Sequence, residues 1–152
     1  AFMGLLSVTP ASHPATFLVL HIASLIGSFS VLHFKNEYKR IRPSQICPAL
    51  FPPIPVPGHA SFPSGHATQA HLMAWCVKSI LAEVPWIDAA GWKVIDKNLT
   101  GLAEQIARNR EIAGLHFKND SKGGEVLAKC VHEALLPLIT NEIANAVAEW
   151  SS

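Results

Sequence analysis

The chain has 152 residues, 49% of them hydrophobic and 15% charged, whereas charged residues average about 25% in soluble proteins. This composition excludes a disordered chain, which needs low hydrophobicity and high charge, and the length predicts one domain over residues 1–152. A formal net charge of +1 at pH 7 argues against a dedicated nucleic-acid-binding protein, which would carry a strong basic excess.

Residues 15–34 form the first apolar segment and contain no Asp, Glu, Lys or Arg. The segment is long enough for a membrane span, which needs about 20 residues. It also contains His21, His33, three serines and a glycine, which lipid tolerates poorly. We expect the central buried helix of a soluble bundle, with a membrane span as the alternative.

Residues 43–63 contain seven of the eleven prolines and no charged side chain. Proline removes a backbone donor and clashes inside a helix, so this stretch is expected to be non-helical. It is longer than an ordinary structureless connection, which favours an ordered, extended loop with a function.

A helix is expected to begin at Ser64, because serine is a favoured N-cap and Pro63 blocks a helix arriving from upstream. This helix should end near Pro85. Further helices are expected over about 89–115, with breaks at Gly91 and Gly101 allowed, then about 122–136 and 140–150. Few β-branched runs alternate with period two, so the fold class is predicted to be all-α, a helical bundle.

Three short patterns carry groups that could do chemistry. Taken singly, each is ordinary: basic residues close helices, PSGH is a common helix start, and a His and an Asp four residues apart often touch. The patterns are Lys35-x6-Arg42-Pro43, Pro63-Ser64-Gly65-His66 and Arg110-x5-His116-x3-Asp120.

Together the three patterns provide what a tetrahedral, multiply charged oxyanion requires. Lys35, Arg42 and Arg110 are three cations, and the start of the helix after Ser64 offers backbone N–H groups. His66 and His116 titrate near neutrality. The combination predicts a site for phosphate or for its near-isostere vanadate.

The spacing and order of these patterns resemble one superfamily. It joins the type 2 phosphatidic acid phosphatases, the bacterial class A acid phosphatases and the vanadium-dependent haloperoxidases. The family pattern is Lys-x6-Arg-Pro, then Pro-Ser-Gly-His, then Ser-Arg-x5-His-x3-Asp. This chain matches the first two patterns fully and has Asn109 in place of the serine before Arg110. The resemblance implies a helical bundle of the acid phosphatase and haloperoxidase type.

The resemblance also implies a role for each matched residue. His116 would be the phosphatase nucleophile, forming a phosphohistidine, or the axial vanadium ligand in a haloperoxidase. His66 would be the general acid and base, and Asp120 would orient His116. The equatorial oxygens of the oxyanion would be held by Lys35, Arg42, Ser64, Gly65 and Arg110.

Within the superfamily, three features favour vanadate-dependent oxidation of halide (bromide) by hydrogen peroxide. His59 lies seven residues before His66, as in vanadium bromoperoxidases, where it would tune halide use; the alternative is an ordinary loop histidine. The segment NREIAGLHFKND resembles the haloperoxidase form, and so does the proline-rich connection. The alternative reaction is cofactor-free hydrolysis of a phosphate monoester or lipid phosphate through His116. A remote third interpretation is an inactive, anion-binding helical module.

These interpretations imply small-molecule substrates, either halide and peroxide or a phosphate ester, with vanadate as cofactor only in the first case. Three widely spaced cysteines exclude a disulfide framework and a CxxC zinc site. We expect a soluble protein, cytoplasmic or periplasmic, with a membrane location not favoured. The chain begins at Ala1 and is expected to be a fragment of a longer one, in which exposed apolar surface would suggest a homo-oligomer. Cys76 and the four tryptophans are expected to be packing residues.

Overall fold

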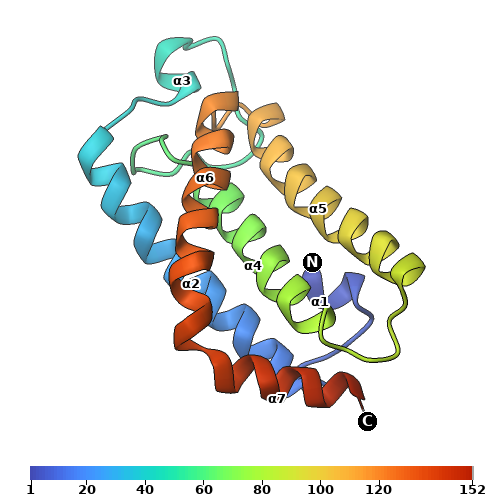
Figure 1. The fold of residues 1–152 in the computed structure, drawn as a ribbon. Helices are drawn as coiled ribbons and strands as arrows, with labels where there is room; N and C mark the ends of the chain where they lie inside the picture. Colours follow the sequence, from blue (N-terminus) through green and yellow to red (C-terminus); the bar gives the residue numbers. More distant parts are fainter. Residues whose placement is uncertain (152) are drawn as a thin grey trace.

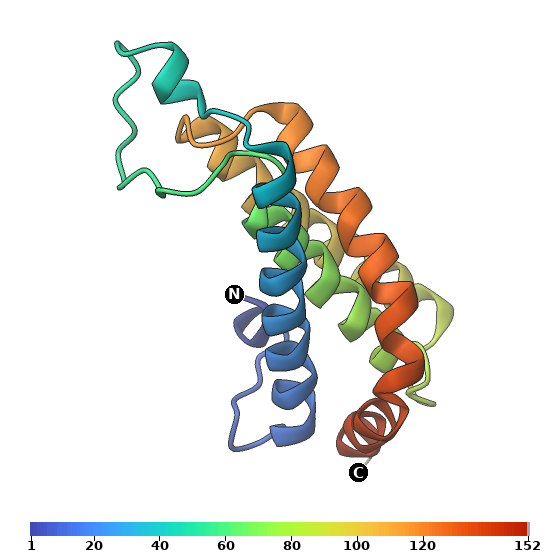
Figure 2. The same cartoon turned by 90° about the vertical axis from the view of Figure 1, so that its left-hand side faces the viewer.

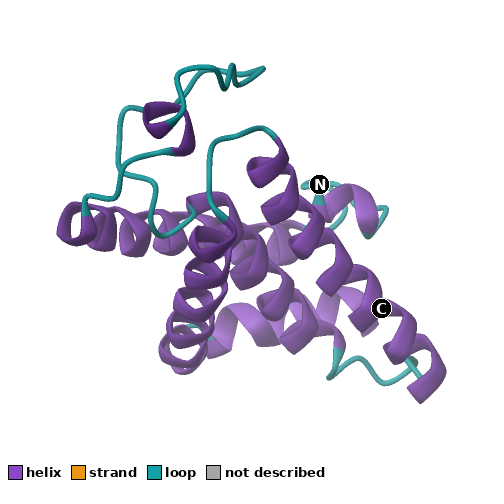
Figure 3. Ribbon diagram, turned by 90° about the horizontal axis from the view of Figure 1, so that it is seen from above, coloured by secondary structure: helices purple, strands orange, loops and turns teal. Residues whose placement is uncertain are grey.

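The computed structural model describes residues 1–151, and within them the fold is all-α with no strand, as predicted (Figure 3). The helices are joined by loops, of which the proline-rich connection before Ser64 is the most extended (Figure 1). The elements are α1 (Phe2–Leu5), α2 (Pro14–Tyr38), α3 (Pro43–Ile46), α4 (Gly65–Leu81), α5 (Ala89–Ile112), α6 (Lys118–Leu135), a 3-10 turn (Leu136–Leu138) and α7 (Thr140–Ser151).

Helix α4, not α2, is the central helix of the bundle. It packs against α2, α5, α6 and α7 (Figures 1 and 2). The expectation that residues 15–34 form the central buried helix is therefore wrong. Helix α2 buries one face, which includes Val19 and Ala23, while Leu25 and Phe29 on the other face are exposed. An apolar sequence around the whole helix does not reveal which face is covered.

By length and composition, one segment among the described residues, Pro14–Ile46, is able to cross a membrane. A third of its most apolar 18-residue window is buried in the bundle. Core helices of soluble proteins and signal sequences meet the same criterion.

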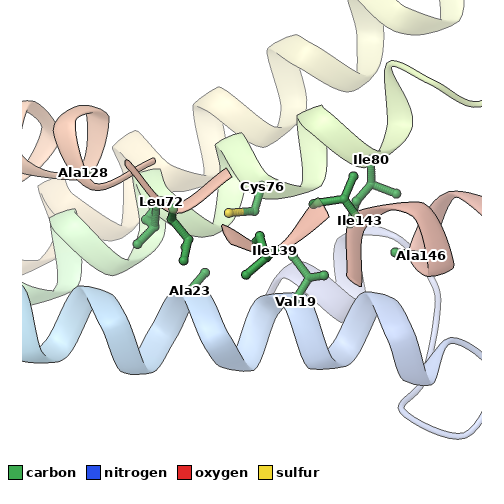
Figure 4. Close-up of a cluster of buried hydrophobic side chains, with 10 residues drawn as sticks. Val19, Ala23, Leu72, Cys76, Ile80, Ala128, Ile139, Ile143 and Ala146 are labelled. Atoms are coloured by element: carbon green, nitrogen blue, oxygen red, sulfur yellow. The ribbon is translucent and has the colours of Figure 1, made fainter. Parts of the chain in front are cut away.

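The hydrophobic core lies along both sides of α4. On one side Leu72, Cys76 and Ile80 pack against Val19 of α2 and Ile143 of α7 (Figure 4). Full burial of such aliphatic side chains stabilises the fold by about 1.5–3 kcal/mol each. Burial also raises the pKa of the Cys76 thiol to about 12, so this cysteine is a packing residue, as expected.

The other side of α4 packs against α5. Val77 and Leu81 of α4 meet Leu99 and Ala103 of α5 in a second buried cluster. Helix α5 begins at its N-cap Asp88, whose carboxylate accepts the Gly91 backbone N–H at 2.7 Å. The helix runs unbroken through both glycines at which breaks were allowed.

The structure confirms the predicted helix start at Ser64, whereas α6 begins four residues before the predicted position. The Ser64 hydroxyl accepts the backbone N–H of Ala67 at 3.4 Å, as an N-cap does. Helix α6 begins at Lys118 rather than near 122, because the Asp120 carboxylate accepts the Phe117 N–H at 2.9 Å and closes the first turn.

Two sequence expectations are corrected by the structure. The stretch 43–63 is not free of helix, since α3 forms one turn with Pro43 as its first residue, where the missing N–H costs nothing. Trp86 is not a packing anchor, because 63% of it is exposed. Its indole N–H donates to the carbonyl oxygen of Trp150, which holds the start of α5 near the end of α7.

Helix α6 approaches the start of α4 so closely that only glycine fits between them. A Cβ on Gly124 would lie 2.7 Å from the Ser64 carbonyl oxygen and 2.9 Å from the Ala67 Cβ. The Ser64 N–H donates to the Asp120 carbonyl oxygen at 2.9 Å across the same contact. The beginning of α4 is thereby fixed against the beginning of α6.

We predict that Gly124→Ala destabilises the protein by about 1–3 kcal/mol, the usual cost of overpacking, and displaces the start of α4. Gly101→Ala is the matched control. It lies in α5 with nothing within 4 Å of the added Cβ, so it should stabilise by about 0.5–1 kcal/mol. Urea unfolding of both variants measures the difference. Equal stability of the two variants would contradict the close contact.

Candidate functional site

The three sequence patterns meet at one end of the bundle. Helix α2 ends there, α4 begins, α5 ends and α6 begins, and the proline-rich loop lies alongside (Figure 1). A cavity of about 280 Å³ opens between them; we call it the anion pocket. Six of the nine predicted site residues line it, namely Lys35, His59, Gly65, His66, Arg110 and His116. The other three, Arg42, Ser64 and Asp120, are fully buried in the surrounding structure.

Lys35 stands in the last turn of α2 and is only 3% exposed. Its ammonium donates to the carbonyl oxygens of Ala60 at 2.6 Å and Ser61 at 3.0 Å. Burial, together with the positive charge of Arg42, lowers the pKa of Lys35 to about 8, against the opposing effect of Asp120. Lys35 therefore carries its charge at neutral pH and begins to lose it in mildly alkaline solution.

Arg42 lies beneath the anion pocket and holds its wall together. It is 1% exposed, and its guanidinium donates to the carbonyl oxygens of His59 (3.0 Å), Leu115 (2.8 Å) and Ala60 (3.3 Å). It also lies 3.2 Å from His59 Nδ1 and 3.5 Å from His116 Nε2. With its N–H groups engaged in this way, Arg42 positions the loop and His116 rather than presenting an open fork to an anion.

Arg110, in the last turn of α5, differs from Arg42 because one of its N–H donors has no acceptor. Its Nε is buried and has no hydrogen-bond partner, and its side chain lines the anion pocket. A buried donor without a partner costs about 1–3 kcal/mol, and an oxyanion in the pocket would supply the missing acceptor. This orphaned atom is the clearest sign that the pocket fits an anion.

The start of α4 adds backbone donors and a dipole. Gly65 is the first residue of the 17-residue helix and lines the pocket. The unpaired N–H groups at a helix N-terminus carry about half a positive charge and favour an anion. Lys35, Arg110 and this helix start thus approach the pocket from three different elements.

His116 lies two residues after Gly114, whose left-handed backbone (φ 70°) turns the chain just beyond the end of α5. Its Nδ1 lies 3.5 Å from the Asp120 carboxylate and 3.4 Å from the Ser61 hydroxyl. Nε2 is the ring nitrogen turned away from Asp120; it lies 3.5 Å from Arg42 Nη1, a contact that a ligand on Nε2 would replace. Burial lowers the pKa of His116 and outweighs the opposing hydrogen bond with Asp120, so the imidazole is neutral at pH 7, as a nucleophile or metal ligand must be.

Ser61 and Arg40 belong to the site although the sequence analysis did not select them. The Ser61 hydroxyl donates to Asp120 Oδ2 at 2.5 Å, and Arg40 Nη1 lies 3.0 Å from Oδ1. Arg40 is one of five charged residues that the sequence places between positions 35 and 42, directly after a stretch without any, and this concentration of charge could have indicated it. Ser61, in an uncharged loop, carried no such signal.

These donors decide the charge state of Asp120. Burial alone would raise its pKa, but hydrogen bonds with His116, Ser61 and the Phe117 N–H, together with the charge of Arg40, lower it overall. Asp120 is thus an ionised carboxylate that faces His116 Nδ1, the arrangement that fixes a histidine tautomer.

His66 and His59 are exposed at the rim of the anion pocket. The pKa of His66 is lowered, first by desolvation and then by the charges of Arg110 and His116. Desolvation likewise lowers the pKa of His59. Both rings are neutral at pH 7 in the free protein. A bound dianion would add negative charge next to His66 and raise its pKa toward the range of a proton donor.

The donor set fits an oxyanion rather than a bare metal cation. Among the described residues, no three His, Cys, Asp or Glu side chains are grouped so as to hold a metal ion. The anion pocket instead combines cations, helix N–H groups and one histidine nitrogen, which suits phosphate and, equally, vanadate with a single protein ligand. The chain matches no protein-family model and no curated protein.

We predict that Ser61→Ala destabilises the protein by about 1–3 kcal/mol at pH 7, because a buried acceptor loses its donor. The lowered pKa of Asp120 contributes stability above the unfolded value of 3.8, and this contribution is lost as the pH falls through the folded value. The variant should therefore differ from the wild type in urea unfolding at pH 7, and the difference should shrink progressively as the pH is lowered below 3.8. Ser30→Ala, which loses only a hydrogen bond within α2, should change stability little over the same pH range.

The pKa of Lys35, about 8, predicts that oxyanion affinity falls as the pH rises above 8. Sulfate is the suitable probe, since its own charge is constant in this range. Calorimetric titration between pH 7 and 10 should show the decline in the wild type. In Lys35→Met the affinity should be low throughout and nearly independent of pH over this interval. The same decline in both proteins would contradict the assignment to Lys35.

Proposed function

We propose that this protein is an oxyanion-binding enzyme whose favoured reaction is the vanadate-dependent oxidation of halide by hydrogen peroxide. The observation that carries the proposal is the buried, unpartnered Nε of Arg110, a side chain that lines the same pocket as Lys35 and His116. The sequence resemblance to the haloperoxidase and phosphatase superfamily supports it, as does the position of His59 at the rim.

Vanadate, when bound, supplies the Lewis-acidic centre at which peroxide is activated toward halide. His116 would hold it through Nε2, with Nδ1 directed at Asp120. Lys35, Arg110 and the N–H groups at Gly65 would neutralise its oxygens. His66, exposed at the rim, would accept a proton from incoming peroxide. Fixed cations in a desolvated pocket provide the largest electrostatic term in such sites.

Phosphate-ester hydrolysis is the second candidate. It is favoured by the neutral state of His116 and by His66, which lines the same pocket and is able to donate and accept a proton. In this reaction His116 Nε2 attacks phosphorus, the P–O bond breaks, and His66 donates a proton to the leaving alkoxide. Water then attacks the phosphohistidine while His66 takes a proton from it. Inorganic phosphate is released and His116 is regenerated.

A paired assay tests the proposal and separates the two reactions. One arm measures bromination by peroxide after vanadate loading, and the other measures p-nitrophenyl phosphate hydrolysis without vanadate. We expect bromination that requires vanadate. Hydrolysis that vanadate inhibits would identify the phosphatase instead. Binding of vanadate or phosphate with neither activity would leave an anion-binding module.

Substitution of His116 and Arg110 tests the residue roles in whichever arm is active. His116→Ala should abolish turnover, and Arg110→Ala should weaken oxyanion binding by about 10- to 150-fold, equivalent to a charge-assisted contact of about 1.5–3 kcal/mol. His33→Ala, on the exposed side of α2, is the control and should retain full activity. Undiminished turnover by His116→Ala would overturn the mechanism.

A further inference from the structure

A second cavity of about 370 Å³ adjoins the anion pocket. It lies where residues of α1, α2, α4 and α5 meet, and we call it the apolar cleft. His66 and Gln69 line both cavities. The two spaces are therefore neighbours on either side of one turn of α4, and His66 stands at their junction.

The lining of the apolar cleft is hydrophobic and carries no charged side chain. Its floor is formed by buried Leu20 and Ala70, and Phe17, 42% exposed, stands on α2 at its edge. His21 and Ser24 are its polar members apart from the two shared residues. The remaining lining comes from Phe2, Met3, Met73 and Ile106, together with Ala1, whose α-amino group is the charged group at this end of the cleft.

The place of His66 determines what the apolar cleft would receive. A general acid must lie within hydrogen-bond reach of the leaving-group oxygen, so the organic part of a substrate lies on the His66 side of the anion pocket. In halide oxidation the oxidising product would likewise form beside His66. In both reactions the group next to His66 would face a mostly apolar wall that carries no charged side chain.

We propose that the apolar cleft is the subsite for an apolar organic group, so that the substrate combines such a group with chemistry at the anion pocket. This inference rests on the proposed function and deepens it. Two sources fit the same chemistry: the alcohol portion of a phosphate ester, or an apolar acceptor that is halogenated. A volume of about 370 Å³ lies within the 300–1,000 Å³ range of small-molecule pockets.

The gain in affinity with chain length is the direct test. We would titrate the protein calorimetrically with n-alkylphosphonates from methyl to octyl, whose C–P bond is not hydrolysed, and with inorganic phosphate. Burial of apolar surface should strengthen binding by up to about fourfold per methylene. The gain should level off once the cleft is filled.

A matched pair of variants on α2 locates the effect. Phe17→Ser removes a ring that lines the apolar cleft, and we expect it to reduce the methyl-to-octyl gain at least fivefold without changing phosphate affinity. Phe29→Ser is the control, because Phe29 is 69% exposed on the same helix and lies outside both cavities. It should leave the whole series unchanged.

A further arm separates the two sources. Binding of neutral 2-naphthol in the presence of saturating phosphate would indicate a halogenation acceptor. Binding of the apolar group only when it is joined to a phosphonate would indicate a phosphate ester.

Two failures are distinguishable. Equal affinities for methyl- and octylphosphonate, with phosphate binding intact, would overturn the cleft proposal and leave the anion pocket standing. Absence of binding by both phosphate and every phosphonate would remove the proposed function, and the cleft proposal with it.

Discussion

The buried carboxylate of Asp120 is the interaction on which the arrangement of the site depends. Its side chain joins the proline-rich loop through Ser61, the segment between α2 and α3 through Arg40, and the start of α6 through the Phe117 N–H. Its backbone carbonyl also accepts the N–H of Ser64 at the start of α4. One residue therefore joins three stretches of the chain, around Arg40, from Ser61 to Ser64, and at the start of α6. The absence of a Cβ at Gly124 allows α6 to come close enough for this to happen.

The second constraint is an imbalance of charge at the same place. Lys35, Arg42 and Arg110 are cationic, and Asp120, the buried carboxylate beside them, is already paired with Arg40. Lys35 and Arg42 donate hydrogen bonds to backbone carbonyl oxygens, whereas the buried Nε of Arg110 has no hydrogen-bond partner. Desolvated positive charge of this kind is costly unless an anion joins it. The neutral imidazoles of His66 and His116 add no further cost, because burial and neighbouring cations keep them deprotonated.

The sequence predicted the features that arise from local chemistry. The N-cap at Ser64, the all-α fold and the convergence of six of the nine predicted residues on one pocket all follow from short-range patterns or from their order along the chain. It did not predict features that depend on packing. Residues 15–34 are apolar on every face, so only the structure shows that α4 is central. Arg42 donates to loop carbonyl oxygens, and Ser61 donates to Asp120. Both contacts depend on where the proline-rich loop folds back against the bundle, which the sequence does not reveal. The roles of these residues in catalysis remain predictions.

The central claim is that the anion pocket binds a tetrahedral oxyanion between Arg110, Lys35 and His116. The most direct measurement is a crystal structure of the protein soaked with tungstate, whose anomalous scattering identifies the anion without ambiguity. We expect density in the anion pocket, with an oxygen accepting a hydrogen bond from Arg110 Nε and the tungsten facing His116 Nε2. Tungstate bound elsewhere, or an empty pocket at saturating concentration, would contradict the claim.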